Sequence, residues 1–395
     1  MAWAERFWAL DQWLVQHQNL WRPQPFMHLS LPWEALYPCL AQWLRQQTLE
    51  QAESLEYLQA PAPFGDWWAQ AQALTALPSL TQVSAPPRLS AHLSTDIPGR
   101  KAQQIEAFAA HLNFTQPVQH WVDWCSGKGH LGRLLAQQAE KPLTCLEYDA
   151  ELVAAGAQLS QRWSISAQHI QQDVLADDVG LHLSSESTPV ALHACGLLHR
   201  QLLRQVVRKE CRQMALAPCC YNRSSEPMYQ PLSAQAQKTE LRLSAEDLRL
   251  PIRETVTAGA RVRRQRDQSM AWRLAFDLLQ RQIRQSDEYL PMPSVSAQWL
   301  HKPFADYCQD LGALRGVQVP PQQDWSTLEV QGWRRLAKVR NLERVRNLFR
   351  RPLELWLVLD QVLFLEEQGY RVQLGAFCAP ELTPRNLLLL AERIS

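Results

Sequence analysis

Hydrophobic and polar positions alternate along the middle of the chain in a regular order. Between residues 102 and 218, short apolar runs follow amphipathic segments, and glycine, proline or acidic residues separate them. Strands that alternate with helices of about 10 to 15 residues form a parallel sheet covered on both faces. The pattern therefore predicts a doubly wound α/β domain. Its expected strands cover residues 121–125, 143–147, 169–174, 190–195 and 214–218, and its expected helices cover residues 102–112, 131–140, 150–163 and 196–209.

Two further strands are expected near the C-terminus, at residues 370–377 and 387–394. They form a β-hairpin at the far edge, which completes a sheet of seven strands. The preceding residues 231–351 are then a mainly helical, arginine-rich insertion before the last two strands. We expect the α/β domain to comprise residues 101–230 and 352–395.

The first 100 residues are expected to form a helical region of their own. Eight of the 16 tryptophans lie between Trp3 and Trp68, at spacings such as Trp8 to Trp13 that indicate packed helix faces. Tryptophan is buried in most folds, although a tryptophan-rich surface also offers stacking positions for nucleotides. We interpret residues 1–100 as a tryptophan-rich accessory region whose aromatic side chains belong to a core.

The composition is typical of a globular protein. With 395 residues, 46% hydrophobic and 20% charged, the chain can bury a substantial core, and its length suggests two or three domains. No segment approaches the ~18 consecutive apolar residues of a membrane span, and residues 1–20 lack a secretory signal, so we expect a cytoplasmic protein without membrane association. The nine cysteines are scattered, which predicts free thiols in a reducing compartment.

A net charge of +1 conceals a separation of charge along the chain. Residues 261–284 contain seven arginines against two aspartates, and residues 334–351 contain eight basic residues against one glutamate. Solvated basic helix faces are one explanation, and a surface for a polyanion is the other, because clustered arginine suits phosphate. The candidate phosphate-binding residues are Arg261, Arg263, Arg264 and Arg266.

A glycine-containing loop joins the first expected strand to the following helix. Asp123 lies near the end of this strand, and Gly127 and Gly129 follow in the sequence SGKG. Glycines allow the backbone to turn sharply and to approach a ligand, and the helix start offers free N–H groups. Glu147 ends the next strand, 20 residues after Gly127, where an acid can accept hydrogen bonds from ribose, and Asp173 closes the third strand. These positions predict a nucleoside-containing ligand in one crevice.

The same residues indicate which ligand to expect. Gly127, Gly129 and Gly132 fit the dinucleotide pattern G-x-G-x-x-G, but Asp123 and Glu147 around this loop resemble motifs I and II of class I S-adenosylmethionine-dependent methyltransferases. The resemblance implies a Rossmann-like sheet and S-adenosylmethionine as cofactor. It also implies that the loop lies under the methionine part of the cofactor, with Glu147 on the ribose and Asp173 on the adenine. The expected cofactor-binding residues are Asp123, Cys125, Gly127, Gly129, Glu147 and Asp173.

Two shorter motifs narrow this resemblance. HACG at residues 193–196 and APCCY at residues 217–221 are similar to motifs of the methyltransferase-like-25 proteins and their bacterial relatives, as is the segment 353–391. The Pro-Cys-Cys element is also similar to that of certain tRNA 2′-O-methyltransferases. The resemblance covers roughly residues 101–221 and 353–394. Leu197 stands where the family usually has an acid, so no role for that acid carries over.

The family sheet implies that HACG and APCCY face each other at the methyl acceptor. His193 is then either a general base or a hydrogen-bonded core histidine, with Tyr221 as an orienting group. The cysteines pack under the cofactor, bind zinc despite an unusual spacing, or add as a thiolate to a pyrimidine. We expect no metal and assign candidate catalytic roles to His193, Cys195, Cys219, Cys220 and Tyr221.

These observations predict an S-adenosylmethionine-dependent methyltransferase that acts on RNA, either rRNA or tRNA, and holds phosphates with its arginine-rich insertion. A protein methyltransferase of the same fold is the alternative, since the resemblance does not fix the acceptor. A degenerate domain that binds RNA or protein without catalysis is a further alternative.

Overall fold

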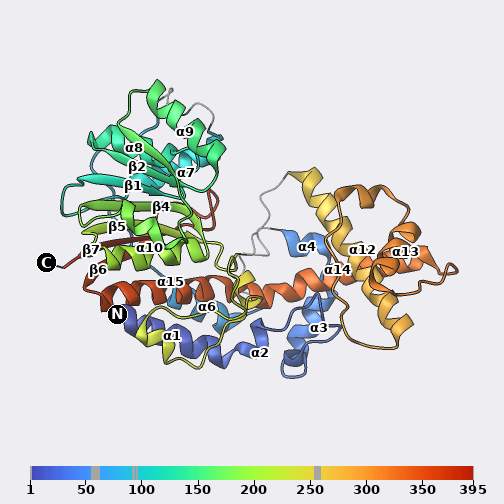
Figure 1. The fold of residues 1–395 in the computed structure, drawn as a ribbon. Helices are drawn as coiled ribbons and strands as arrows, with labels where there is room; N and C mark the ends of the chain where they lie inside the picture. Colours follow the sequence, from blue (N-terminus) through green and yellow to red (C-terminus); the bar gives the residue numbers. More distant parts are fainter. Residues whose placement is uncertain (1, 55–62, 91–93, 95–96, 253–258, 395) are drawn as a thin grey trace. The chain divides into compact units, whose positions relative to one another are not determined.

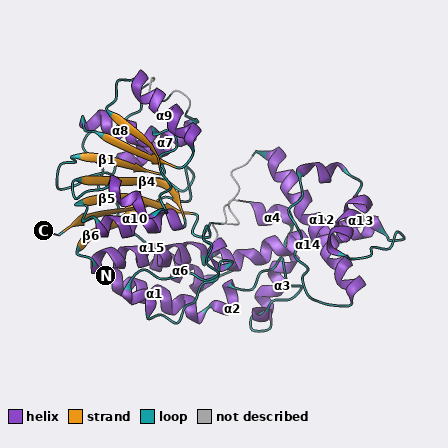
Figure 2. Cartoon of the chain, viewed as in Figure 1, coloured by secondary structure: helices purple, strands orange, loops and turns teal. Residues whose placement is uncertain are grey.

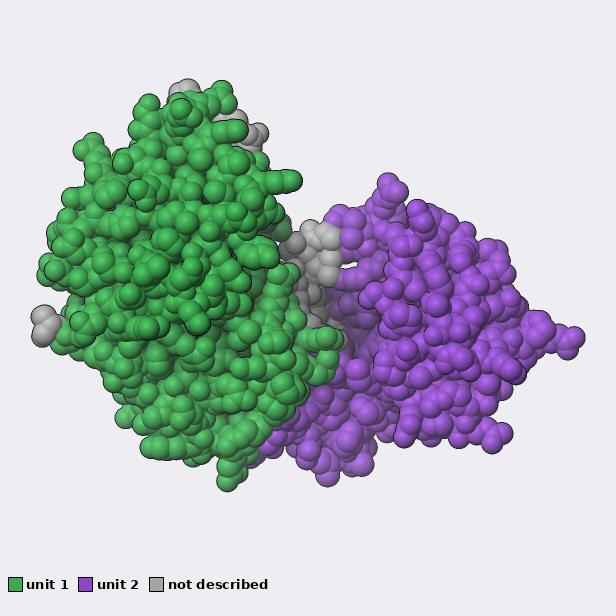
Figure 3. Space-filling view, in the orientation of Figure 1, with its two compact units in different colours: residues 1–15, 74–253, 351–395 green, residues 16–73, 254–350 purple. Residues whose placement is uncertain are grey.

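The computed structural model describes residues 2–54, 63–90, 94, 97–252 and 259–394. The chain forms two compact units (Figure 3). Unit 1 comprises residues 1–15, 74–253 and 351–395, and unit 2 comprises residues 16–73 and 254–350. Of the described helices, none is long and apolar enough to cross a lipid bilayer.

Unit 1 is built on a seven-stranded sheet with the order β3-β2-β1-β4-β5-β7-β6 (Figure 1). Strands β1 to β5 run parallel, and β7 is antiparallel to both β5 and β6. This order and these directions are consistent with the Rossmann-like sheet that the resemblance implied, so the predicted fold class is confirmed. The strands are β1 (His120–Trp124), β2 (Leu143–Glu147), β3 (Ala167–Gln171), β4 (Ser187–Cys195), β5 (Gln213–Cys219), β6 (Tyr370–Ala376) and β7 (Leu387–Arg393).

Helices cover both faces of this sheet, as Figure 2 shows. Alternate residues of β1 reach opposite faces: Trp121 packs in a core with Phe108 and Leu134, whereas the Trp124 indole donates to the Leu198 carbonyl at 3.0 Å. The central strands are buried on both sides, which explains their near-continuous apolar runs. The helices of unit 1 are α1 (Trp3–Gln16, to residue 15), α7 (Gly99–Ala109), α8 (His130–Ala139), α9 (Ala150–Arg162), α10 (Leu197–Arg208), α11 (Ala234–Gln237) and α15 (Arg350–Glu367, from residue 351).

The N-terminal region does not follow the predicted boundary at residue 100. Helix α1 belongs to unit 1, where Phe7 stacks on Trp356 at 5.3 Å and the Trp356 indole donates to Asp11 at 2.9 Å. Residues 74–100 also belong to unit 1, and residues 16–73 belong to unit 2. The apolar face of α1 requires a partner, and α15 supplies it. The interpretation of the tryptophans as core residues is confirmed for Trp13, Trp21 and Trp33, which are all buried.

Unit 2 is helical over its described residues, as predicted for the insertion, although residues 16–73 join it. Its aromatic core surrounds Trp272 and Phe276 of α12, which pack against Phe304 and Tyr307 of α13. The predicted insertion also includes residues 253–258, which lie outside the described residues. The helices of this unit are α2 (Gln18–Trp21), α3 (Pro38–Gln46), α4 (Leu49–Glu53), α6 (Gly65–Thr75, to residue 73), α12 (Ala260–Arg284), α13 (Phe304–Arg315) and α14 (Trp325–Asn347).

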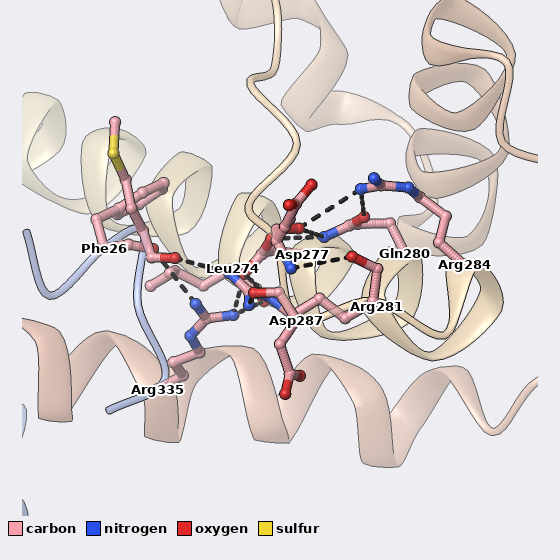
Figure 4. A network of polar contacts seen from close by, with 11 residues as sticks. Phe26, Leu274, Asp277, Gln280, Arg281, Arg284, Asp287 and Arg335 are labelled. Atoms are coloured by element: carbon pink, nitrogen blue, oxygen red, sulfur yellow. Dashed lines mark hydrogen bonds and ion pairs between the residues drawn. The ribbon is translucent and has the colours of Figure 1, made fainter. Parts of the chain in front are cut away.

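A buried ionic network joins α12 to α14 in unit 2 (Figure 4). The fully buried Asp277 accepts from Arg281 at 2.9 Å and from Arg335 at 2.5 Å. Gln280 donates to the other carboxylate oxygen of Asp277 at 2.8 Å. Every oxygen of this carboxylate is therefore paired, which is the condition for burying its charge.

Candidate active site

The candidate site lies at the carboxyl edge of the parallel strands in unit 1. Because β1 to β5 run in the same direction, the segments that follow them meet at this edge. The loop after β1, Glu147 at the end of β2 and the cysteines at the ends of β4 and β5 all belong to it. Ligands of open α/β sheets bind at this edge, so the topology brings the predicted site residues together.

The loop between β1 and α8 bends through three positions with positive φ. Cys125 and Gly127 both have a φ of 57°, and Gly129 has a φ of 73°. Cys125 therefore holds a left-handed conformation that usually falls to glycine. A Cβ atom placed on Gly127 would meet nothing within 4 Å, so the backbone here lines open space. A Cβ on Gly129 would instead come within 2.9 Å of His169.

Asp123 supports this loop from beneath. Its side chain is buried, and its Oδ2 accepts the Gly132 backbone N–H of α8 at 2.9 Å. Burial raises the pKa of Asp123 to about 7, although the Gly132 hydrogen bond acts in the opposite direction. A Cβ on Gly132 would lie 3.0 Å from this carboxylate, which explains the third glycine. Asp123 therefore positions the start of α8 and the loop before it.

Glu147 connects the ends of β1 and β2. Its carboxylate accepts the Gly127 N–H at 2.8 Å and the Asp149 N–H at 3.0 Å, and the side chain is half-buried. Each carboxylate oxygen keeps a further lone pair for a hydroxyl group. Asp173 lies two residues beyond the end of β3, is exposed, and accepts the Leu175 N–H at 2.9 Å.

These residues fit a nucleoside-containing ligand. The open space beside Gly127 leaves room for a ligand next to the backbone, and Glu147 borders it with acceptor capacity for ribose hydroxyls. In such a complex, Gly127 and Cys125 would form the floor and Glu147 the wall. Asp173 is a further acid that follows β3.

The segments that follow β4 and β5 are tied together by their backbones. Gly196 donates to the Cys219 carbonyl at 3.1 Å, and Leu197 donates to the Arg223 carbonyl at 3.2 Å. A Cβ on Gly196 would lie 2.0 Å from the Arg223 oxygen, and Gly196 has a φ of 57°. Only glycine fits this approach, so HACG and CCYNR form one structural element, as their predicted adjacency required.

Three cysteines meet within this element. Cys195 and Cys219 are paired in register, with their Sγ atoms 3.5 Å apart, and the Sγ atoms of Cys195, Cys219 and Cys220 all lie within 4.8 Å of one another. Hydrogen bonds from Cys195 and Cys219, together with the charges of Arg385 and Arg223, lower the pKa of Cys220. The same hydrogen bonding raises the pKa of Cys219. All nine cysteines are free thiols, as predicted.

His193 is oriented by a residue far away in the sequence. Gln104 of α7 donates to the Leu382 carbonyl at 3.2 Å, so its Oε1 faces Nε2 of His193 at 2.9 Å. This arrangement assigns the proton to Nε2 and leaves Nδ1 as the basic nitrogen. Partial loss of solvent around the imidazole, followed by the positive charge of Lys101, lowers the pKa of His193. The lower pKa favours the neutral form of the ring.

Tyr221 is buried, although the sequence predicted it as an orienting group at the methyl acceptor. Its side chain is only 5% exposed, its ring packs against His199, and its hydroxyl faces the Pro218 carbonyl at 3.5 Å. Burial raises its pKa well above the ordinary range, so it is a poor proton donor at neutral pH. The adjacent Asn222 carries a buried Oδ1 with no hydrogen-bond partner among the described residues.

The two arginine-rich segments differ in how they use their charge. On α12, Arg261, Arg263 and Arg264 are exposed and make no ion pair with the described residues, whereas Arg266 pairs with Glu53 and Asp267. In the second segment, internal contacts hold most of the arginines. They pair Arg335 with Asp277, Arg340 with Asp267, Arg346 with Glu343 and Arg351 with Glu354, and they place Arg344 against the rings of Trp43 and Phe64.

Several residues of the site were not selected from the sequence. Gln104 acts on His193 from a segment outside the motifs, and Arg385 acts on Cys220 from the C-terminal segment that carries part of the resemblance. Arg133 is buried below the loop, where it bonds His130 at 2.9 Å. Its spacing of three residues from His130 on α8 was the available hint, because such residues share a helix face.

The comparison with known families assigns this part of the chain to a class of protein. Residues 100–227 match the family described as a methyltransferase domain, which supports a methyltransferase in general. Named relatives carry a different title, "glutathione S-transferase C-terminal domain-containing protein". The Xenopus laevis protein is 29% identical over 132 residues and the Homo sapiens protein 26% over 197 residues. The homologue from Drosophila pseudoobscura pseudoobscura is 31% identical over 143 residues.

These alignments cover 33%, 47% and 35% of this chain, respectively, but only 21%, 28% and 24% of the relatives. The matched part is thus less than a third of each relative. The comparisons support the methyltransferase part of the expected resemblance.

Proposed function

We propose that this chain transfers a methyl group from S-adenosylmethionine to RNA. The observation that supports the proposal is the carboxyl edge of the sheet, which holds both the glycine loop after β1 and the element formed by HACG and CCYNR. The exposed arginines of α12 support RNA as the acceptor. The free thiols are compatible with the proposed cytoplasmic location.

The cofactor side of the proposal rests on Gly127 and Glu147. S-adenosylmethionine, when bound, supplies an electrophilic methyl group, so the protein must mainly align the acceptor and remove a proton. Glu147 would hold the ribose hydroxyls while it keeps its hydrogen bond to Gly127. Asp123 would keep the loop in place without contacting the ligand, because its carboxylate is buried.

The acceptor side rests on His193 and Asn222. Nδ1 of a neutral His193 can take the proton of an acceptor hydroxyl or amine, and Gln104 fixes the ring for that transfer. The buried Oδ1 of Asn222 needs a donor, and an N–H or O–H group of the acceptor would satisfy it.

An RNA acceptor is favoured by the charge on unit 2. Three exposed arginines lie in the first turns of α12, where the helix dipole disfavours positive charge. Phosphate groups would compensate this cost, and arginine binds them through two N–H groups at once. In the same unit, Arg334 and Lys338 are exposed on α14 and line a concave surface with His28.

Labelling of cell extract distinguishes the acceptors. Extract from cells that lack the gene is incubated with the purified chain and S-adenosylmethionine that carries a tritiated methyl group, and then divided between ribonuclease and protease. We expect ribonuclease to release the label. Label that only protease releases would refute an RNA acceptor, and the absence of any label would refute the enzyme.

The role of the exposed arginines is tested by the double variant Arg263→Glu and Arg264→Glu. We expect weaker RNA binding and a smaller dependence of the binding constant on salt, because each phosphate contact contributes about one unit to the salt slope. The control variant, Lys238→Glu with Arg315→Glu, makes the same change in net charge at other exposed positions. Equal binding by both variants would show that α12 makes no specific phosphate contact.

A further inference from the structure

We propose that Cys195, Cys219 and Cys220 form a binding site for one thiophilic metal ion of the class that zinc represents. The three sulfur atoms lie at the candidate active site but on the acceptor side of it. Binding of the ion by the three sulfurs does not depend on methyl transfer, whereas the role of its fourth ligand position rests on the proposed function.

The sulfur positions fit a single ion. Zinc binds thiolates at about 2.3 Å with tetrahedral angles, which separates neighbouring sulfur atoms by roughly 3.8 Å. The Cys195 and Cys219 sulfurs are 3.5 Å apart, and all three sulfurs lie within 4.8 Å of one another. Small side-chain rotations would therefore place the three ligands around one ion.

The backbone is shaped to bring adjacent cysteines to the same point. Successive residues of a strand direct their side chains to opposite faces, so Cys219 and Cys220 would diverge in an extended chain. Cys220 instead has a φ of 48°, which turns the chain back directly after β5. A non-glycine residue in this left-handed region is strained and persists where the surroundings enforce it. The hydrogen bond from Arg223 N–H to the Cys220 carbonyl, at 2.9 Å, helps to enforce it.

The unusual sequence spacing has a structural explanation. Most zinc sites draw paired ligands from one loop, whereas here Cys195 comes from β4 and the other two cysteines from β5 and the residue directly after it. Pairing of Cys195 with Cys219 on neighbouring strands brings two ligands together, as a short spacing within one loop does in most zinc sites. The ties between Gly196, Cys219 and Arg223 preset the distance between the two strands' ends.

Charge and ligand number indicate what the ion would do. Three thiolates and one divalent ion leave a net charge of about −1, which the nearby positive charges of Arg223 and Arg385 offset. Three protein ligands leave a fourth tetrahedral position, which is the arrangement of catalytic rather than structural zinc sites. That position would hold water or an atom of the acceptor.

Metal analysis of the purified full chain tests the proposal. The protein is prepared in reducing, chelator-free buffer without a polyhistidine tag, supplied with Zn²⁺, desalted and analysed by plasma mass spectrometry. We expect about one zinc per chain, and at least tenfold less in Cys195→Ser and Cys220→Ser. The matched controls Cys39→Ser and Cys378→Ser should retain the metal. Wild-type chain without zinc, or with zinc that survives both site substitutions, would overturn the proposal.

A second measurement avoids variants that fail to fold. Wild-type chain is alkylated with and without Zn²⁺, and the modified cysteines are identified by mass spectrometry. Zinc should protect Cys195 and Cys220 and leave the exposed Cys39 reactive. Equal labelling in both samples would contradict the site. Binding of S-adenosylmethionine, measured on the same samples, separates failure of this proposal from failure of the proposed methyltransferase function.

Discussion

Replacement of Asp123 by asparagine tests how the cofactor loop is supported. The carboxylate is buried beneath the loop, and burial raises its pKa to about 7 from an ordinary value of 3.8. The folded state thus holds a proton on Asp123 over a pH range in which the unfolded state has released it. Rising pH therefore favours unfolding, and the contribution of the protonated group is lost as pH passes through the folded-state pKa.

The size of the effect follows from the shift. A difference of about three pKa units corresponds to about 4 kcal/mol between the two limits, and to about 2 to 3 kcal/mol between pH 5 and pH 8. The asparagine side chain of D123N would not titrate, but its amide oxygen can still accept the Gly132 N–H. The stability of D123N relative to wild type should therefore increase by this amount from pH 5 to pH 8.

Hydrogen exchange of residues 120–139, measured in a urea series at each pH, reports the stability of the sheet and α8 without contributions from unit 2. Both proteins are compared at the same pH, so that other titrating groups and intrinsic exchange rates cancel. A difference that stays constant from pH 5 to pH 8 would refute the protonated, buried state of Asp123. S-adenosylmethionine binding should survive the substitution, because the residue supports the loop and does not face the ligand.

Two other substitutions test the packing of each unit. Gly196→Ala should destabilise unit 1 by at least about 3 kcal/mol, because its Cβ would overlap the Arg223 carbonyl, whereas Gly99→Ala has free space and should be nearly neutral in urea unfolding. Asp277→Ala should cost about 3 to 5 kcal/mol, since two buried guanidinium groups lose their partner, while the exposed Asp306→Ala should change stability by less than about 0.5 kcal/mol. Equal melting temperatures for either pair would contradict the corresponding contact.

The sheet was predictable because its signal is local and repeated. Each buried strand is a short apolar run, and a polar residue such as Asp123 or Glu147 lies at or near its end. Parallel topology then places those residues at one edge without knowledge of any side-chain contact. The adjacency of Cys195 and Cys219 was instead implied by the resemblance to class I methyltransferases, and the two residues are a register pair in the structure.

Other features depend on contacts that the sequence does not encode locally. Composition could not reveal that Asp277 neutralises Arg335 across 58 residues, or that α1 packs on α15. The left-handed backbone at Cys125 had no signal, because glycine usually occupies such a position. The sequence suggested that Tyr221, beside two cysteines, faces the acceptor. In the structure its ring packs in the core. A residue at the end of a buried strand can face either the sheet edge or the interior, and the sequence does not distinguish the two.

Titration of S-adenosylmethionine into the full chain tests the central claim most directly. Calorimetry should show one site in the wild-type protein and binding weakened at least tenfold in Glu147→Ala, which removes charge-assisted hydrogen bonds worth about 1.5 to 3 kcal/mol each. The exposed Glu151→Ala, on the neighbouring helix α9, should bind as the wild type does. Absence of binding to the wild-type chain, or undiminished binding to Glu147→Ala, would contradict the proposed cofactor site.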